Sequence, residues 1–95
     1  LAFQYLEQGL WEDAIPQFSL VIRKLPDLSK AWRGRGIAYF HEERYNLAME
    51  DLNRAIELDP GYPDPYKDRA LVNEAIGEKI QALDDLSSAI SYLFQ

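Results

Sequence analysis

Apolar and small residues recur along this chain at the three- and four-residue spacing of an amphipathic helix, as Ala48 and Leu52 do within residues 45–58. No segment shows the strict apolar–polar alternation of a half-buried β-strand. The pattern predicts six helices, at about residues 1–8, 12–25, 29–42, 45–58, 64–76 and 79–93. The short connections between them make neighbouring helices antiparallel. We expect Asp27 or Ser29 to cap the start of the third helix.

The pattern also repeats along the chain with a period of 34 residues. Sets of residues that keep their size and polarity at this period are Ala14, Ala48 and Ala82; Phe18, Leu52 and Leu86; Ile22, Ile56 and Ile90; Ala2, Gly36 and Ala70; Trp32 and Tyr66; Pro26 and Pro60. A fixed period of this length is the signature of a helical repeat protein. Each unit contains two of the predicted helices, and the small residues mark places where helices approach closely.

The complete unit resembles a tetratricopeptide repeat. The residues that carry the resemblance are Trp32, Gly36, Tyr39, Tyr45, Ala48, Leu52, Ala55 and Pro60. The resemblance covers essentially the whole chain and implies an all-α fold, a right-handed superhelical α-solenoid of antiparallel helix pairs. It implies one tetratricopeptide domain over residues 1–95, with an N-terminally truncated repeat at 1–28, a complete repeat at 29–62 and a C-terminally incomplete repeat at 63–95.

Several positions depart from the pattern of this family, among them Lys79 in place of an aromatic residue after the turn and Phe94 in place of the closing proline. Glu43 stands where a turn glycine is usual, although Gly9 and Gly77 keep glycine at the matching positions of the other repeats. Asn73 stands where a second aromatic residue is usual, as Tyr39 is in the complete repeat. None of these departures changes the expected fold.

Composition narrows the classes of function. The 95 residues include ten Lys and Arg against sixteen Asp and Glu, which gives a formal net charge of −6. Because this charge repels a phosphate backbone, we expect no nucleic-acid partner. No apolar run approaches the roughly 20 residues of a transmembrane helix, so we expect no membrane role. The chain has no cysteine and no visible targeting signal, from which we expect a cytoplasmic location.

The residues that carry chemistry are too few and too scattered for an enzyme. His41 is the single histidine, and no serine that could pair with it stands in a Gly-x-Ser-x-Gly context. One histidine without cysteine does not make a typical zinc site. Adjacent carboxylates, such as Asp84 and Asp85, diverge by about 100° on a helix. We therefore expect no catalytic residue, no metal and no cofactor.

The resemblance implies that the first helix of each pair lines a concave groove that binds an extended peptide or a partner helix. Carried over position by position, the expected groove residues are Phe3, Lys30, Arg33, Ile37, Phe40, His41, Lys67, Asp68 and Leu71. Apolar residues exposed together on a concave face suggest a binding surface. The alternative is that these apolar side chains only complete the packing between neighbouring first helices.

The charges at the groove argue against one binding mode of the family. Chaperone adaptors hold a terminal carboxylate with a clamp of Lys, Asn and Arg, whereas the matching positions here hold Phe3, Gly34, Asp64 and Asp68. The two aspartates would repel an acidic terminus. With Arg33 in one layer and aspartates in the next, we expect a ligand of mixed charge with an apolar anchor.

The sequence thus predicts a non-catalytic scaffold for protein–protein interaction. Two alternatives stay open: a docking or regulatory arm of a larger enzyme, and a structural segment that assembles with itself. The last helix bears an apolar stripe broader than one neighbour can cover, which includes Leu86, Ile90, Leu93 and Phe94. This stripe predicts self-association through the C-terminal helix.

Overall fold

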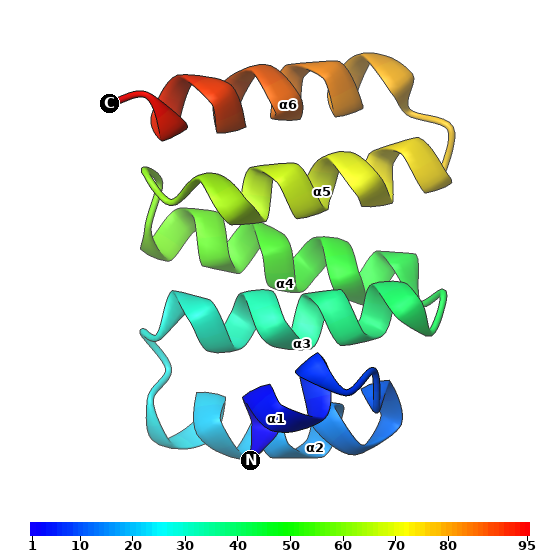
Figure 1. The fold of residues 1–95 in the computed structure, drawn as a ribbon, viewed down its shortest axis with the longest axis vertical. Helices are drawn as coiled ribbons and strands as arrows, with labels where there is room; N and C mark the ends of the chain where they lie inside the picture. The colour runs from blue at the N-terminus through cyan, green and yellow to red at the C-terminus, as the bar shows by residue number, and fades with distance from the viewer.

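The computed structural model describes residues 1–95 and consists of six α-helices (Figure 1). They are α1 (Ala2–Glu7), α2 (Trp11–Lys24), α3 (Ser29–His41), α4 (Tyr45–Leu58), α5 (Pro63–Ala75) and α6 (Lys79–Leu93). All six predicted helices are confirmed, and each end lies within one residue of its predicted position. None of the helices combines the length and the apolar character that crossing a membrane requires.

The helices stack in chain order, with the two termini at opposite ends of the stack (Figure 1). Each helix packs against the next, and in addition α1 contacts α3 and α3 contacts α5. The second helices of the pairs, α2, α4 and α6, do not contact one another. Because only the first helices meet, the stack curves with α1, α3 and α5 on its inner side. We call this side the concave face and the side of α2, α4 and α6 the outer face.

Small residues allow the close approach of helices that the 34-residue period predicts. Ala14 and Ala48 are fully buried, and Ala82 is nearly so. Gly36 faces α4, where a Cβ atom would lie 3.1 Å from Leu52 Cγ and 3.3 Å from the Ala48 carbonyl oxygen. These positions therefore have small residues because the facing helix leaves no room for a longer side chain.

The turns within the three helix pairs share a left-handed backbone conformation. Gly9, Glu43 and Gly77 lie 34 residues apart and have φ values of 72°, 61° and 86°. Glycine adopts this conformation freely, whereas a residue with a Cβ is strained by about 1–2 kcal/mol. The replacement of glycine by Glu43 thus leaves the turn geometry unchanged and adds local strain.

The capping prediction for the third helix is wrong. Leu28 occupies the N-cap position of α3 in an extended conformation, and no side chain makes a capping hydrogen bond there. Ser29 is already the first helical residue, which places its hydroxyl outside the capping position. Asp27 lies one residue too early.

Two aromatic side chains hold the loops between helix pairs. The Trp32 indole Nε1 donates a hydrogen bond to the Pro26 carbonyl oxygen at 2.8 Å. One period later, the Tyr66 hydroxyl donates to the Pro60 carbonyl oxygen at 2.7 Å. Because the donor sits on the helix that follows each proline, the bond fixes the direction in which the next pair leaves the loop.

Buried ion pairs also follow the period. Arg35 Nε lies 2.8 Å from Asp51 Oδ2, and Arg35 Nη1 donates to Ser19 Oγ at 3.0 Å, so this arginine joins α3 to both α2 and α4. Arg69 and Asp85 repeat the pair 34 residues later, at 2.7 Å. Burial raises the pKa of Asp51, although the hydrogen bonds and charge of Arg35 oppose the rise. The pairs fix the register of neighbouring helices, because a shift of one residue would leave a buried charge unpaired.

Candidate functional site

A small cavity of about 70 Å³ lies on the concave face between α3 and α5. Its lining consists of Ile37, Phe40 and His41 from α3, Leu52 from α4, and Asp68 and Leu71 from α5. The volume is less than half that of an apolar cavity of roughly 150 Å³, which holds one benzene ring. The cavity therefore has room for the tip of a small aliphatic side chain and not for an aromatic ring.

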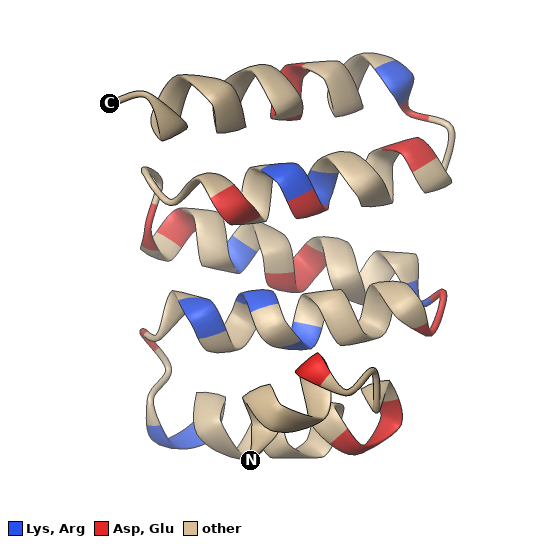
Figure 2. Ribbon diagram, viewed as in Figure 1, with Lys and Arg blue, Asp and Glu red and all other residues tan.

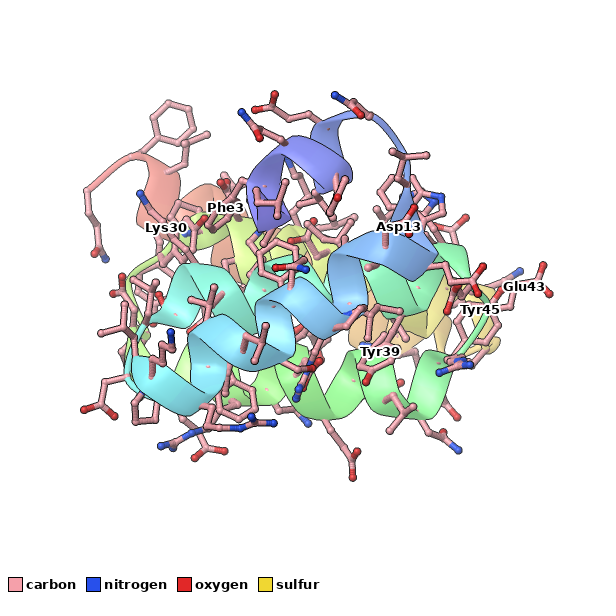
Figure 3. The ribbon with its side chains drawn as sticks, turned by 90° about the horizontal axis from the view of Figure 1, so that it is seen from below. Phe3, Asp13, Lys30, Tyr39, Glu43 and Tyr45 are labelled. Carbon is pink, nitrogen blue, oxygen red and sulfur yellow. The ribbon has the colours of Figure 1, made fainter.

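Five of the nine residues expected in the groove line this cavity, and α1 places a sixth along the same face. The ring of Phe3 meets the buried ring of Phe18 edge-on, with 5.0 Å between centroids. Phe3 is 43% exposed and Leu71 is 49% exposed, so both present apolar surface to solvent. Figure 3, which looks along the stack from the α1–α2 end, labels Phe3 beside α1 and Tyr39 on the opposite side, beside α4.

Sequence reasoning missed Leu52 as a cavity residue. The 34-residue period assigns it to the core together with Phe18, and its side chain is indeed fully buried. It also lines the cavity, because α4 lies behind the gap between α3 and α5. A residue that serves the core and a pocket at once has no separate signal in the sequence.

Arg33 is not free to bind a ligand, which corrects the expected charge pattern of the groove. Its Nε donates to Asp68 Oδ2, its Nη1 lies 3.6 Å from Asp64 Oδ2, and Nη1 also donates to the Tyr62 hydroxyl at 3.3 Å. Figure 2 shows basic residues along α3 and both acidic and basic residues on α4 and α5, which follow it in the stack. Arg33 and the two aspartates Asp64 and Asp68 therefore neutralise each other between α3 and α5. Of the basic residues expected in the groove, Lys30 and Lys67 are the exposed ones.

Asp68 is a buried carboxyl group on the wall of the cavity. It is only 8% exposed, and burial raises its pKa although the hydrogen bond and the charge of Arg33 oppose the rise. Because Arg33 holds the carboxylate, Asp68 shapes the cavity wall and is not available as a strong acceptor for an incoming charge.

Gly34 does not line the groove as its position in the family pattern implies. It is buried, and a Cβ atom at Gly34 would lie 2.3 Å from Phe18 Cζ. The residue instead forms a recess in α3 that accommodates the ring of Phe18. Its role is in the packing of α2 against α3.

His41 forms one side of an aromatic cluster beside the cavity. Its imidazole stacks on the Trp11 ring, with 4.0 Å between centroids and 7° between planes, and it meets Phe40 edge-on at 5.3 Å. The stack holds the exposed imidazole against α2. No three His, Cys, Asp or Glu side chains of the chain come together as a metal site would require.

Repeated antiparallel helix pairs with a curved inner face define a helical-repeat protein, and comparison with known proteins gives the family. Residues 29–62 match the model of the tetratricopeptide repeat. The chain is 36% identical over 95 residues to human Tetratricopeptide repeat protein 13, and the aligned region covers 95% of this chain and 11% of that protein. It is also 35% identical over 89 residues to human Serine/threonine-protein phosphatase 5, and this aligned region covers 94% of this chain and 18% of that protein. This chain thus belongs to the tetratricopeptide repeat family.

A solved structure shares the whole fold. The TPR2B domain of yeast Sti1, determined in complex with pHsp70, superposes with a TM-score of 0.91 at 25% sequence identity. The match covers 96% of this chain and 73% of that chain. Since the present chain spans only 11% and 18% of the two relatives above, it corresponds to one segment of such proteins.

Proposed function

We propose that this chain is a non-catalytic module for protein–protein interaction that binds an extended peptide or a partner helix along its concave face. The observation that carries the proposal is the cavity between α3 and α5, with the exposed side chain of Leu71 at its edge. A cavity of this size suits one small aliphatic anchor, and the apolar surface of Phe3 extends the contact toward α1.

The charges of the groove favour a ligand that does not depend on a terminal carboxylate. Arg33 is engaged by Asp64 and Asp68, so it is not available as a clamp. The exposed Lys30 and Lys67 can still attract acidic residues that flank the anchor. The resulting ligand has an aliphatic anchor and acidic flanks.

Capture of partners from lysate of the source cells tests the proposal. Leu71→Glu places a charge at the edge of the cavity on a half-exposed position, and an Ile37→Glu, Phe40→Glu double variant disrupts its wall. Leu20→Glu is the matched control, because Leu20 is 44% exposed on the outer helix α2. We expect a partner that is retained by the parent and by Leu20→Glu and lost by both groove variants. Equal capture by all four chains, each shown to be helical by circular dichroism, would refute the groove as the binding surface.

A second candidate function is that of a docking arm within a larger enzyme. The observation that favours it is the similarity to a protein phosphatase of which this chain spans 18%. The chain with its natural flanking sequence would then change the activity of a linked catalytic domain. Removal of residues 1–95 from such a larger enzyme should alter its activity, and an unchanged activity would exclude this role.

A third candidate, self-association, rests on the exposed apolar stripe of α6. Its members Leu86, Ile90, Leu93 and Phe94 are 40%, 58%, 65% and 82% exposed. The corresponding residues of earlier helices, Phe18 and Leu52 for Leu86, are fully buried. We expect sedimentation velocity to show dimers that Ile90→Glu converts to monomers. A monomeric parent chain at high concentration would rule the candidate out.

A further inference from the structure

An open cleft of about 360 Å³ lies on the outer face, away from the groove. Its lining consists of Met49 and Asn53 from α4, Arg69 and Asn73 from α5, and Gln81, Asp84 and Asp85 from α6. Since α4 and α6 do not contact one another, α5 forms the floor between them. The cleft is thus distinct from the concave face in both position and polarity.

Comparison across one 34-residue period shows which side chain is missing from this cleft. Asn73 of α5 corresponds to Tyr39 of α3, and Arg69 corresponds to Arg35. The Tyr39 ring lies against Arg35, with 5.7 Å from its centroid to the guanidinium carbon. The Asn73 side chain is shorter and donates from Nδ2 to Asp85 Oδ2 at 2.9 Å. The first ring contact of the pattern is kept, because the Arg69 guanidinium carbon lies 5.6 Å from the centroid of the Tyr66 ring, as that of Arg35 lies 5.3 Å from Trp32. The floor of the cleft therefore keeps the arginine with its first ring and lacks the second ring, which Tyr39 supplies in the preceding repeat.

The arginine of the cleft floor is held in a fixed orientation. Arg69 Nε lies 3.1 Å from both carboxylate oxygens of Asp85, and Arg69 Nη2 donates to Oδ1 at 2.7 Å. Its Nη1 donates to Asn53 Oδ1 at 2.9 Å. A guanidinium held in its plane by such bonds can take a second ring contact, beside that of Tyr66, without further loss of side-chain freedom.

The charges around this guanidinium select against an anion. Asp84 is exposed and Asp85 is buried, so the lining carries two carboxylates against the single positive charge of Arg69. A neutral aromatic ring gains the cation–π contact without repulsion, whereas a phosphorylated ring would face the carboxylate of Asp84.

We propose that this outer cleft binds an unphosphorylated tyrosine or phenylalanine side chain of a partner protein, which takes the place that Tyr39 fills in the preceding repeat. Arg69 lies against the ring, and the Met49 side chain forms one wall. The cleft is a second binding surface, independent of the concave groove.

The single methionine of the chain makes a direct test simple. Labelling with [¹³C-methyl]methionine gives one methyl resonance, from Met49, in the wall of the cleft. The probes are N-acetyltyrosinamide, its O-phosphorylated form and N-acetylleucinamide, each titrated to about 20 mM, above the roughly millimolar dissociation constant expected for a single ring. We expect a saturable ring-current shift with the tyrosine probe, at least about tenfold weaker binding of the phosphorylated probe, and no saturable shift with the leucine probe.

Two variants separate the cleft from other surfaces. Asn73→Tyr restores the ring found at Tyr39 and should abolish the shift, while Asp85 keeps its bonds to Arg69. Leu71→Glu alters the concave face and should leave the shift unchanged, so failure of the groove proposal and failure of the cleft proposal give different results. No saturable shift in the parent chain, an equal response to the leucine probe, or a shift that persists in a folded Asn73→Tyr chain would overturn the assignment.

Discussion

Gly34→Ala should destabilise this chain, although the same change stabilises most helices. In a helix interior, alanine is favoured over glycine by about 1 kcal/mol. At Gly34, however, the new Cβ would lie 2.3 Å from Phe18 Cζ and 2.5 Å from Phe18 Cε1. Ordinary contacts of a Cβ atom fall between 3.4 and 4 Å, so both ring atoms lie about 1 Å closer than an ordinary contact allows.

The ring has no free space into which it could move. Phe18 is fully buried and belongs to the core cluster that contains Ala14, Ala31 and Ala38. Overpacking of a core typically costs about 1–3 kcal/mol. Taking the upper part of that range for so large an overlap, and subtracting about 1 kcal/mol for helix propensity, gives a net loss of about 2 kcal/mol in the free energy of unfolding.

Urea denaturation followed by far-UV circular dichroism measures this difference, with an unchanged slope as evidence that the unfolding transition is the same. A double-mutant cycle with Phe18→Leu identifies the cause. In the Phe18→Leu background, Gly34→Ala should become neutral or stabilising, because the overlapping ring atoms are gone. A Gly34→Ala chain as stable as the parent would refute the packing argument, and simple additivity of the two losses would show that the Phe18 ring is not responsible.

Three further predictions concern buried charge, turn strain and pH. Asp85→Ala leaves the guanidinium of Arg69 without its partner and should lower the free energy of unfolding by about 3 kcal/mol. Glu57→Ala breaks an exposed pair and should lower it by less than about 0.5 kcal/mol. Equal urea midpoints for the two variants would contradict this difference. Glu43→Gly relieves a left-handed residue and should raise the thermal midpoint with a gain of about 0.5–1 kcal/mol; a lowered midpoint would show that the turn is not strained. Burial raises the folded-state pKa of Asp51 and Asp68 above 3.8, the value for an unperturbed aspartate. Because the folded state then binds a proton more readily than the unfolded state, the stability of the folded chain should increase as pH falls from 7 through these folded pKa values. Urea midpoints of the parent and of an Asp51→Asn, Asp68→Asn chain across that range test the sign, because the parent should gain stability relative to the variant as pH falls.

The groove illustrates how far position-by-position inference from a family pattern extends. Such inference identifies the face of each helix, and Ile37, Phe40 and Leu71 do lie together at one cavity. It does not identify the partner of each side chain. Arg33 pairs with Asp64 and Asp68, which lie 31 and 35 positions further along the chain. These contacts depend on the distance and tilt between α3 and α5. Tyr62, which also contacts Arg33, belongs to a loop and follows no helical spacing.

At the outer cleft too, the sequence identifies a position and the packing decides what that position does. The sequence identifies Asn73 as a departure from the aromatic residue expected at its position, because the 34-residue period aligns it with Tyr39. Whether the missing ring leaves a cleft depends on its surroundings. Only the packing of α4 and α6 on α5 shows that the space stays open and that Arg69 forms its floor.

The amino-acid sequence by itself determined the six helices, their pairing and their repeat, because helix formation and amphipathic packing depend on the spacing of residues a few positions apart. It also determined which positions must be small, since a strict period assigns Ala14, Ala48 and Ala82 to one kind of contact. The tertiary structure decided that Gly34 receives Phe18 rather than a ligand, and that Arg33 is neutralised by an aspartate of the next helix pair. These outcomes depend on the distances between helices remote in sequence, where a change of 1 Å separates a clash from a contact and an ion pair from a free charge.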